Sequence, residues 1–166
     1  MHDIREIRMV PIGYVHNQVK EWVDVVWEDL VSDIILEERW LPALDGLDEF
    51  SHIWVITWLN RLPADERGTR PRVHPERRQD LPAVGLFATR SPRRPNPIAM
   101  TAVELLGRQG TVLRVKGLDM LDGTPVLDIK PYLAQGDRIN GTRAPLWIRQ
   151  LWRERLAQVR ERQRGG

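Results

Sequence analysis

The sequence predicts a mainly β fold, a small antiparallel barrel or sandwich, followed by one amphipathic helix. Three observations support this fold class. Short β-branched segments recur between residues 9 and 118, turn-forming Gly, Pro and Asp residues separate them, and helical spacing of apolar residues is confined to the C-terminal end. A chain of 166 residues, 42% of them hydrophobic, ordinarily forms one domain with a core of its own.

Six segments are expected to form strands. Residues 52–59 are a nearly continuous apolar run, which is typical of a strand buried on both faces. Residues 98–106 and 111–118 are expected to pair as a hairpin joined by residues 107–110. The other predicted strands are residues 9–16, 33–40 and 83–88. Short strands at this spacing favour a barrel or sandwich over alternating strands and helices.

The segments between these strands are expected to be turns and loops. Residues 44–49 predict a turn with acidic capping residues, and residues 18–30 fit either a helix or irregular structure. Residues 61–82 contain 4 prolines and many charges, which indicates a long loop. Long ordered loops in compact domains are often functional.

The C-terminal segment has a helical pattern. Six arginines occupy much of the face left by the apolar positions, which are Leu146, Trp147, Leu151, Trp152, Leu156 and Val159. We therefore expect a β-barrel domain over residues 1–142 and an amphipathic helix over residues 143–166. The helix is expected to pack on the barrel or on a second subunit.

The composition excludes several classes of protein. The chain has no cysteine, so a disulfide framework and a zinc site built on thiolates are excluded. No apolar run approaches the length of a membrane span, and the N-terminus lacks the apolar stretch of a signal peptide. We expect a soluble, cytoplasmic protein without a membrane partner. No metal site is expected either, because Asp119, Asp122 and Asp128 are not spaced as in a calcium-binding loop.

Charge is unevenly distributed along the chain. Residues 1–60 carry 4 Lys/Arg against 12 Asp/Glu, whereas residues 61–94 carry 9 Arg against 4 acids and residues 149–166 carry 6 Arg against 2 acids. Such asymmetry indicates either a surface for an anionic partner or simply solvated loops and helices. Of the 25 basic residues 22 are Arg, which binds phosphate in a two-pronged fashion.

Residues 90–100 (RSPRRPNPIAM) are the first motif that could carry chemistry. Its three prolines fix φ and remove backbone donors, so the stretch is neither a central strand nor a helix. A rigid extended loop would present Arg90, Arg93, Arg94 and Asn96 with little entropic cost on binding. The alternative is a proline-rich connector with solvated arginines.

Two further motifs contain candidate ligand-binding groups. In residues 121–133 (LDGTPVLDIKPYL) the Asp122–Gly123 pair predicts a turn, and its carboxylate suits a ribose hydroxyl or an ammonium group. In residues 46–61 (GLDEFSHIWVITWLNR) the strand ends at Asn60 and Arg61, where ligand groups often gather. Both have plain structural alternatives, a capped turn and a strand end. A nucleophile elbow, a G-x-G-x-x-G fingerprint and a Walker A loop are all missing, which disfavours a hydrolase, a Rossmann methyltransferase and an NTPase.

These motifs resemble the TsaA-like family, also called the TrmO or YaeB-like family. The matching pieces are IGYVHN, GLDEFSHIWV, GLFATRSPRRPNPIAMT and GLDMLDGTPVLDIKPYL, which lie in order between about residues 9 and 133. The resemblance implies a small β-barrel and a homodimer that holds S-adenosylmethionine near the subunit interface. It also implies N6-methylation of threonylcarbamoyladenosine at position 37 of tRNA.

The resemblance also implies which residues form the cofactor site. An early loop of the family is replaced here by Trp27, Glu28 and Asp29, and the pair after the GLDEFSHIWV strand is Asn60 and Arg61, where many relatives carry His-Gln or His-Glu. The remaining implied cofactor contacts are Arg90, Met100, Asp119, Met120, Leu121 and Asp122. We expect no counterpart of the additional C-terminal domain of longer bacterial members, so arginines of this chain would have to replace it, or the substrate differs.

Methyl transfer from a sulfonium mainly needs alignment, and the urea-like N6 of the implied substrate needs to lose its proton. Asp122 is the candidate base, worth roughly 10²–10⁴-fold in rate, unless it binds the cofactor instead, and Asn96 would orient either the N6 group or the threonyl carboxylate. Substrate contacts are expected from Arg93, Arg94, Asn96 and Lys130. The tRNA phosphates are expected on the last helix and on Arg67, Arg70, Arg72, Arg77 and Arg78. Two alternatives stay open: methylation of a small molecule, and cofactor binding without catalysis.

Overall fold

A computed structural model describes residues 6–22 and 25–164, with side chains up to residue 157. The chain divides into two compact units. The first contains the chain up to residue 69 together with residues 92–134. The second contains residues 70–91 together with the chain from residue 135 onwards.

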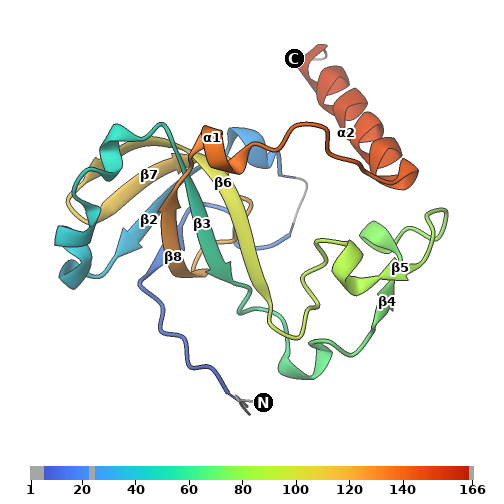
Figure 1. The fold of residues 1–166 in the computed structure, drawn as a ribbon, viewed down its shortest axis with the longest axis horizontal. Helices are drawn as coiled ribbons and strands as arrows, with labels where there is room; N and C mark the ends of the chain where they lie inside the picture. The colour runs from blue at the N-terminus through green and yellow to red at the C-terminus, as the bar shows by residue number, and fades with distance from the viewer. Residues whose placement is uncertain (1–5, 23–24, 165–166) are drawn as a thin grey trace. The chain divides into compact units, whose positions relative to one another are not determined.

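The first unit is a closed six-stranded antiparallel barrel with the strand order β1-β2-β7-β6-β3-β8 (Figure 1). Its strands are β1 (Gly13–His16), β2 (Val31–Leu36), β3 (His52–Trp58), β6 (Ile98–Gln109), β7 (Val112–Lys116) and β8 (Pro125–Pro131). The predicted mainly β fold and the predicted β6–β7 hairpin are thus confirmed. The turn of this hairpin contains Gly110 at φ 59°, a left-handed conformation that glycine adopts without strain.

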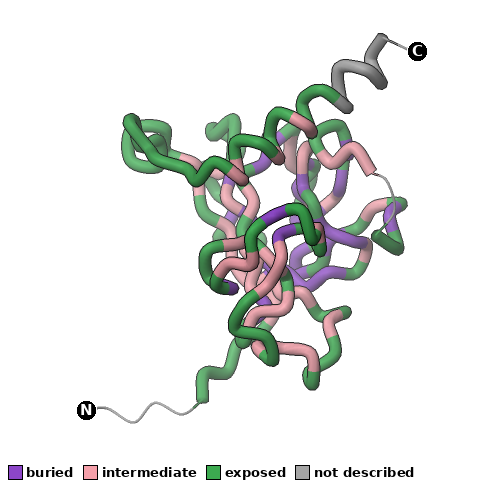
Figure 2. The backbone as a smooth tube through the Cα atoms, turned by 90° about the vertical axis from the view of Figure 1, so that its right-hand side faces the viewer, coloured by how far each residue is buried: buried purple, intermediate pink, exposed green. Residues whose placement is uncertain are grey.

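The core of the barrel comes from one side of each strand. Ile34, Ile53, Leu113 and Val126 are among the residues that are completely buried, and the buried positions are coloured purple in Figure 2. On β3 burial alternates: Val55 faces the core, whereas its outward neighbours are only half-buried. The prediction that residues 52–59 are buried on both faces is therefore wrong. In a closed barrel one face of each strand lies on the core and the other faces outward. The outward residues of β3 can still be apolar, because large aromatic side chains there shield each other from water.

Two local features shape the barrel. A Cβ on Gly13 would lie 2.2 Å from the carbonyl oxygen of Ile35, so β1 can approach β2 this closely only with glycine. Between β3 and β8 the register changes: Ile56 faces Asp128 and Thr57 faces Val126, which leaves Leu127 as the extra residue of a β-bulge. Bulges bend a strand and redirect side chains, and they are frequent beside functional sites.

Several element boundaries differ from the sequence predictions. The first strand begins at Gly13 instead of residue 9, since Pro11 lacks a backbone donor. The strand predicted at 33–40 ends at Leu36, and a 3₁₀ helix with Pro42 inside it follows over Glu38–Leu44. The strand predicted at 83–88 is short, with β5 (Val84–Gly85) followed by a 3₁₀ helix over Leu86–Ala88. A 3₁₀ helix, with three residues per turn, usually occurs in short segments such as these.

The connecting segments contain further 3₁₀ turns. One covers Leu47–Glu49 after Gly46, whose φ is 81°, in the predicted turn. Others cover Trp27–Asp29 in the ambiguous segment, and Ala64–Glu66 and Pro75–Arg77 in the predicted long loop. The same loop also contains the short strand β4 (Arg72–Val73), which pairs with β5.

The second unit combines the β4–β5 hairpin with the C-terminal helix α2 (Leu146–Arg164), after the one-turn helix α1 (Ala134–Asp137). The predicted C-terminal helix is confirmed. Trp152 and Leu156 are 68% and 54% exposed, and Val159 lies beyond the described side chains. The boundary at residue 142 and the surface on which the helix packs stay predictions. Among the described helices, none combines the length and apolar character needed to cross a bilayer.

Candidate functional site

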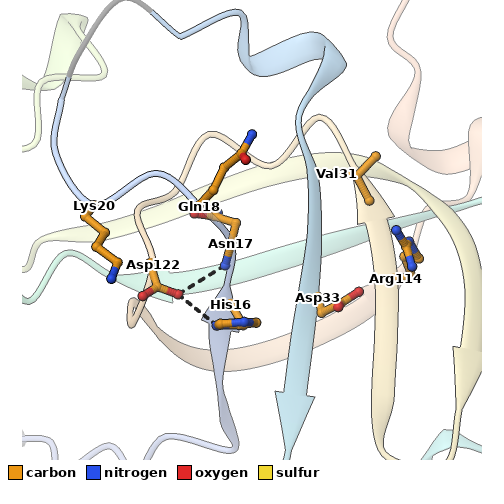
Figure 3. A pocket seen from close by; sticks show the side chains of 8 residues that line it. All are labelled: His16, Asn17, Gln18, Lys20, Val31, Asp33, Arg114 and Asp122. Atoms are coloured by element: carbon orange, nitrogen blue, oxygen red, sulfur yellow. Dashed lines mark hydrogen bonds and ion pairs between the residues drawn. The ribbon is translucent and has the colours of Figure 1, made fainter.

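The turn between β7 and β8 contains Asp122, which holds the end of β1. The Asp122 carboxylate lies 3.1 Å from His16 Nδ1 and accepts a hydrogen bond of 3.1 Å from the backbone N–H of Asn17 (Figure 3). The backbone N–H of Asp122 in turn donates a hydrogen bond of 2.8 Å to the carbonyl of Val19, in the β1–β2 loop. Gly123 completes the turn at φ 76°. The Asp-Gly turn predicted from the sequence is therefore also a contact point for the β1–β2 loop.

Asn17 fixes the same loop from its other side. Its amide nitrogen donates to Ser32 Oγ and to the carbonyl of Met120, each at 3.0 Å, and its amide oxygen accepts from the N–H of Val19 at 2.9 Å. These bonds use both donors of the amide. Asn17 thus ties the end of β1 to β2 and to the β7–β8 loop.

Arg61 joins the two loops directly. Its Nη1 donates to the carbonyl of Lys20 at 2.6 Å, and its Nη2 donates to the carbonyl of Asp122 at 2.9 Å. The pair Asn60–Arg61 after β3 therefore lies beside the 119–122 loop, as the resemblance implies for cofactor contacts. Here the Arg61 guanidinium binds protein backbone through both Nη1 and Nη2, a contact that could not be predicted from the sequence.

The other implied cofactor residues of the barrel lie around this junction. Trp27 packs against the apolar cluster of Val19, Leu30 and Leu121, and Asp29 pairs with Lys116 at 3.2 Å. Glu28 is exposed between them on the same 3₁₀ turn.

On the other side of the junction, Asp119 accepts a hydrogen bond from Thr101, the neighbour of the 52% exposed Met100 on β6. Met120 is buried, and its sulfur accepts a 3.2 Å hydrogen bond from Thr57. Arg90 belongs to the second unit, where it follows the 3₁₀ helix Leu86–Ala88.

Two hollows lined by described residues of the barrel bear on the predicted site residues. The first, of about 520 Å³, has two cations, two carboxylates and a histidine in its wall, and Figure 3 shows its lining residues: His16, Asn17, Gln18, Lys20, Val31, Asp33, Arg114 and Asp122. The second, of about 650 Å³, is lined by Glu6, Ile7, Arg8, Met9, Pro11, Trp58, Asn96, Pro125 and Leu127. The two predicted catalytic residues, Asp122 and Asn96, therefore line different hollows.

Several of the basic residues predicted to contact substrate or tRNA are engaged within the protein. Arg93 pairs with Glu66 at 2.8 Å, and Lys130 pairs with Asp128 at 2.7 Å. Arg67 lies over the Trp58 ring with 5.4 Å between its Cζ and the ring centroid. Arg94 is half-buried in the same proline-rich loop as Arg93.

In the second unit Arg78 joins the loop to helix α2. Its guanidinium donates to both Asp80 and Glu154. These hydrogen bonds lower the pKa of Asp80 and of Glu154 below the usual carboxyl range and raise the pKa of Arg78. Arg72 donates to the carbonyl of Ala83 at 2.8 Å. In the described part of the chain, Arg70 and Arg77 form no such bond, so their charges remain available to an anion.

Sequence reasoning missed three residues at these sites. His16 and Asn17 end the IGYVHN piece, and an Asn directly after a strand is a signal for side-chain bonding to nearby backbone. Trp58 is one of seven tryptophans, and nothing in the sequence distinguishes it from the others. Trp58 lines the second hollow together with Leu127, the extra residue of the β-bulge, for which the sequence has no visible signal.

The profile of the tRNA-methyltransferase O N-terminal domain matches residues 24–138. A probable S-adenosyl-L-methionine-binding protein of Methanothermobacter thermautotrophicus is 41% identical over 138 residues, which cover 81% of this chain and 96% of that protein. An S-adenosyl-L-methionine-binding protein of Archaeoglobus fulgidus is 36% identical over 134 residues, 92% of its length.

Two longer proteins match part of their length. The tRNA (adenine(37)-N6)-methyltransferase of Escherichia coli is 45% identical over 95 residues, which cover 55% of this chain and 40% of that enzyme. The crystal structure of TrmO from Pseudomonas aeruginosa aligns with a TM-score of 0.70 at 29% identity, over 88% of this chain and 63% of that one. The present chain thus spans less than two thirds of these two proteins.

Proposed function

Because this chain belongs to the family of the tRNA-methyltransferase O N-terminal domain, we propose that it transfers a methyl group from S-adenosylmethionine to N6 of an adenine in tRNA. The acceptor is threonylcarbamoyladenosine at position 37. The observation that carries the proposal is the Arg61 junction, the pair of hydrogen bonds from the Arg61 guanidinium to the backbone carbonyls of Lys20 and Asp122. It joins two segments far apart in sequence, 60–61 and 119–122, that the resemblance assigns to one cofactor site.

The residues at this junction fit the chemistry of S-adenosylmethionine. The carboxylate of Asp119 is exposed and suits a ribose hydroxyl or the ammonium group, and the half-buried Trp27 beside Leu121 offers an apolar surface for a purine. The exposed Met100 side chain is a second apolar contact. When bound, S-adenosylmethionine supplies a methyl group on a sulfonium, so the protein has to align the acceptor and accept its proton.

The His16–Asp122 pair is the group that accepts this proton. Two acceptor sites of the Asp122 carboxylate face His16 and the N–H of Asn17, and a carboxylate offers about four such sites. Asp122 acts as the base through a remaining site, or it holds His16 with the proton on Nδ1 and leaves Nε2 as acceptor. Both arrangements require the Asp122 carboxylate.

A homodimer with tRNA as partner completes the proposal. The implied position of the cofactor near a subunit interface agrees with the exposure of Met100 on the outward side of β6. Phosphates are contacted by Arg70 and Arg77, whose charges are available, more than by Arg67, Arg72 and Arg78. Light scattering coupled to size-exclusion chromatography measures the subunit number, and a monomer at micromolar concentration would remove the dimer from the proposal.

The decisive experiment uses the full chain, methyl-labelled S-adenosylmethionine and tRNA from cells that lack this gene. Nucleoside mass spectrometry should find the label in threonylcarbamoyladenosine, and Asp122→Asn should abolish it. A matched control is Arg39→Ala, which removes an exposed arginine of the 3₁₀ helix Glu38–Leu44. Absence of label from every nucleoside would refute tRNA methylation.

A second candidate has a specific observation in its favour. The relatives that this chain matches over more than nine tenths of their length are named for binding the cofactor, without a stated acceptor. These names are compatible with a protein that binds the cofactor without catalysis and with a methyltransferase that acts on a small molecule. Calorimetry with S-adenosylhomocysteine together with a gel shift against total tRNA separates the candidates, since only the leading one requires both interactions.

A further inference from the structure

We propose that the second hollow of the barrel, lined by Trp58, Asn96 and residues 6–11, receives the adenine ring of the acceptor nucleotide. The inference rests on the proposed function and specifies the acceptor side of it. At about 650 Å³ the hollow lies in the range of roughly 300–1,000 Å³ that is usual for small-ligand sites.

The wall that contains Asn96 is rigid. Asn96 lies between Pro95 and Pro97, and Pro97 is completely buried. The carbonyl of Asn96 accepts from the N–H of Ile98, and the carbonyl of Pro97 accepts from the N–H of Leu59, both at 2.8 Å. The backbone is thus fixed on either side, while the side chain of Asn96 is exposed. Its amide forms no hydrogen bond to another residue in the described part of the chain.

The aromatic wall is held in a comparable way. Trp58 ends β3 beside the bulge at Leu127, which also lines the hollow. The guanidinium of Arg67 lies over one face of the indole, and its Nη2 donates to the carbonyl of Leu62 at 3.1 Å. Arg67 therefore keeps the ring in place, and Trp58 remains half-buried with part of its surface toward the hollow.

The third wall is the segment before β1. Its anchor is Ile12, whose N–H donates to the carbonyl of Val126 at 2.8 Å on β8. Arg8 in this wall adds a cation at the margin of the hollow. An aromatic surface, an amide and a nearby cation together match a nucleotide, which has a π-face, a hydrogen-bonding edge and a phosphate.

The amide of Asn96 also selects among bases. Asn recognises adenine with two hydrogen bonds, donating to N7 and accepting from the N6 amino group. Because N6 of threonylcarbamoyladenosine carries a single hydrogen, which leaves during methylation, Asn96 is expected to hold this base by donating to N7, with N6, the atom to be methylated, beside its amide. Asn96 is then a substrate-contacting residue, which agrees with the role predicted from the sequence.

The adenine in question belongs to the acceptor, although the cofactor also contains one. None of the residues assigned to the cofactor lines this hollow, whereas the 60–61 and 119–122 segments meet at the Arg61 junction. The two adenines would therefore occupy different places on the barrel.

The direct test is a nitrogen-15 NMR titration of the full chain saturated with S-adenosylhomocysteine. Adenosine 5′-monophosphate should shift the indole N–H of Trp58 and the side-chain amide of Asn96, whereas ribose 5-phosphate, which lacks the base, should shift neither. If S-adenosylhomocysteine alone shifts both groups, the hollow belongs to the cofactor and the inference is overturned. Unmoved resonances with adenosine monophosphate overturn it as well.

Kinetics on tRNA give an independent test. Trp58→Leu should raise KM roughly tenfold or more, the effect of losing one base–aromatic stack, and Trp58→Phe should recover most of it. The control is Trp40→Leu, because Trp40 is also half-buried beneath an arginine, with Arg39 Cζ 5.0 Å from its ring, but lines neither hollow. Affinity for S-adenosylhomocysteine should stay unchanged in all three variants.

These measurements separate the two proposals. Absence of S-adenosylhomocysteine binding by the wild-type chain refutes the proposed function. Normal S-adenosylhomocysteine binding with an unchanged KM in Trp58→Leu refutes only the acceptor hollow.

Discussion

Arg61→Ala should loosen the junction between the β1–β2 loop and the β7–β8 loop without disturbing the barrel. The substitution removes two hydrogen bonds from a guanidinium to backbone carbonyls, those of Lys20 and Asp122. Each typically contributes about 0.5–1.5 kcal/mol net at an exposed position. We therefore expect the free energy of unfolding to fall by about 1–3 kcal/mol. For a chain of 166 residues this lowers Tm by roughly 2–4 °C per kcal/mol.

The loss should be local. Hydrogen exchange should become faster at the amides of Asn17 and Asp122, which depend on this junction, and stay unchanged at core positions such as Ile34. Affinity for S-adenosylhomocysteine should fall by a factor of about 5–30, which corresponds to 1–2 kcal/mol. Lysine cannot span both carbonyls as a fork, so Arg61→Lys should recover less than half of the loss.

The assays are urea denaturation, amide hydrogen exchange and calorimetry with S-adenosylhomocysteine. Arg70→Ala is the stability control, since Arg70 forms no hydrogen bond within the described residues, and its effect should stay within about 0.5 kcal/mol. If Arg61→Ala leaves unfolding, exchange and affinity at wild-type values, the junction has no energetic role, and its assignment to a cofactor site loses its main support.

Three other perturbations test separate parts of the molecule. Asp122→Asn should lower the methylation rate by roughly 10²–10⁴-fold, with less than a tenfold change in S-adenosylhomocysteine affinity, and a wild-type rate would exclude Asp122 from proton transfer. Glu154→Gln should destabilise the second unit at neutral pH. Because Arg78 lowers the folded-state pKa of Glu154 and of Asp80, their contribution is complete above the unfolded carboxyl pKa of about 4 and is lost in acid, so wild type and variant should converge in acid denaturation. A difference that persists at low pH would contradict this ion-pair origin. Charge reversal of Arg70 and Arg77 should weaken tRNA binding and reduce its salt slope by about 2, as seen by gel shift at several salt concentrations, whereas reversal of Arg39 should leave the slope unchanged.

The sequence predicted five of the six barrel strands because their signals are local, whereas β8 was not predicted and the strand predicted at 83–88 lies outside the barrel. The hairpin of β6 and β7 follows from two β-branched runs and a glycine turn, and helix α2 follows from its apolar spacing. The strand predicted at 33–40 was wrong beyond Leu36 because the chain turns into a 3₁₀ helix there, and no strong breaker stands before Pro42.

The sequence predicted which residues lie near the candidate site, but not the contacts that these residues make. Asp122 and Arg61 were identified as neighbours of a ligand, but the bonds of Arg61 to Lys20 and Asp122 depend on three segments that meet only in the folded barrel. Ion pairs between residues far apart in the sequence cannot be predicted for the same reason. From the sequence Arg78 is an unpaired basic residue, whereas the fold places Glu154 beside it. Charge counted along a sequence thus overstates the charge available to RNA.

The division of the second unit into two stretches of chain sets an order of assembly. The last barrel strand, β8, ends at Pro131, whereas the loop around Arg78 meets Glu154 only after a further stretch of chain has been made. On the ribosome the six strands can close while residues 70–91 still lack their helical partner. Residues 70–91 therefore acquire the Arg78–Glu154 contact only after helix α2 has been synthesised.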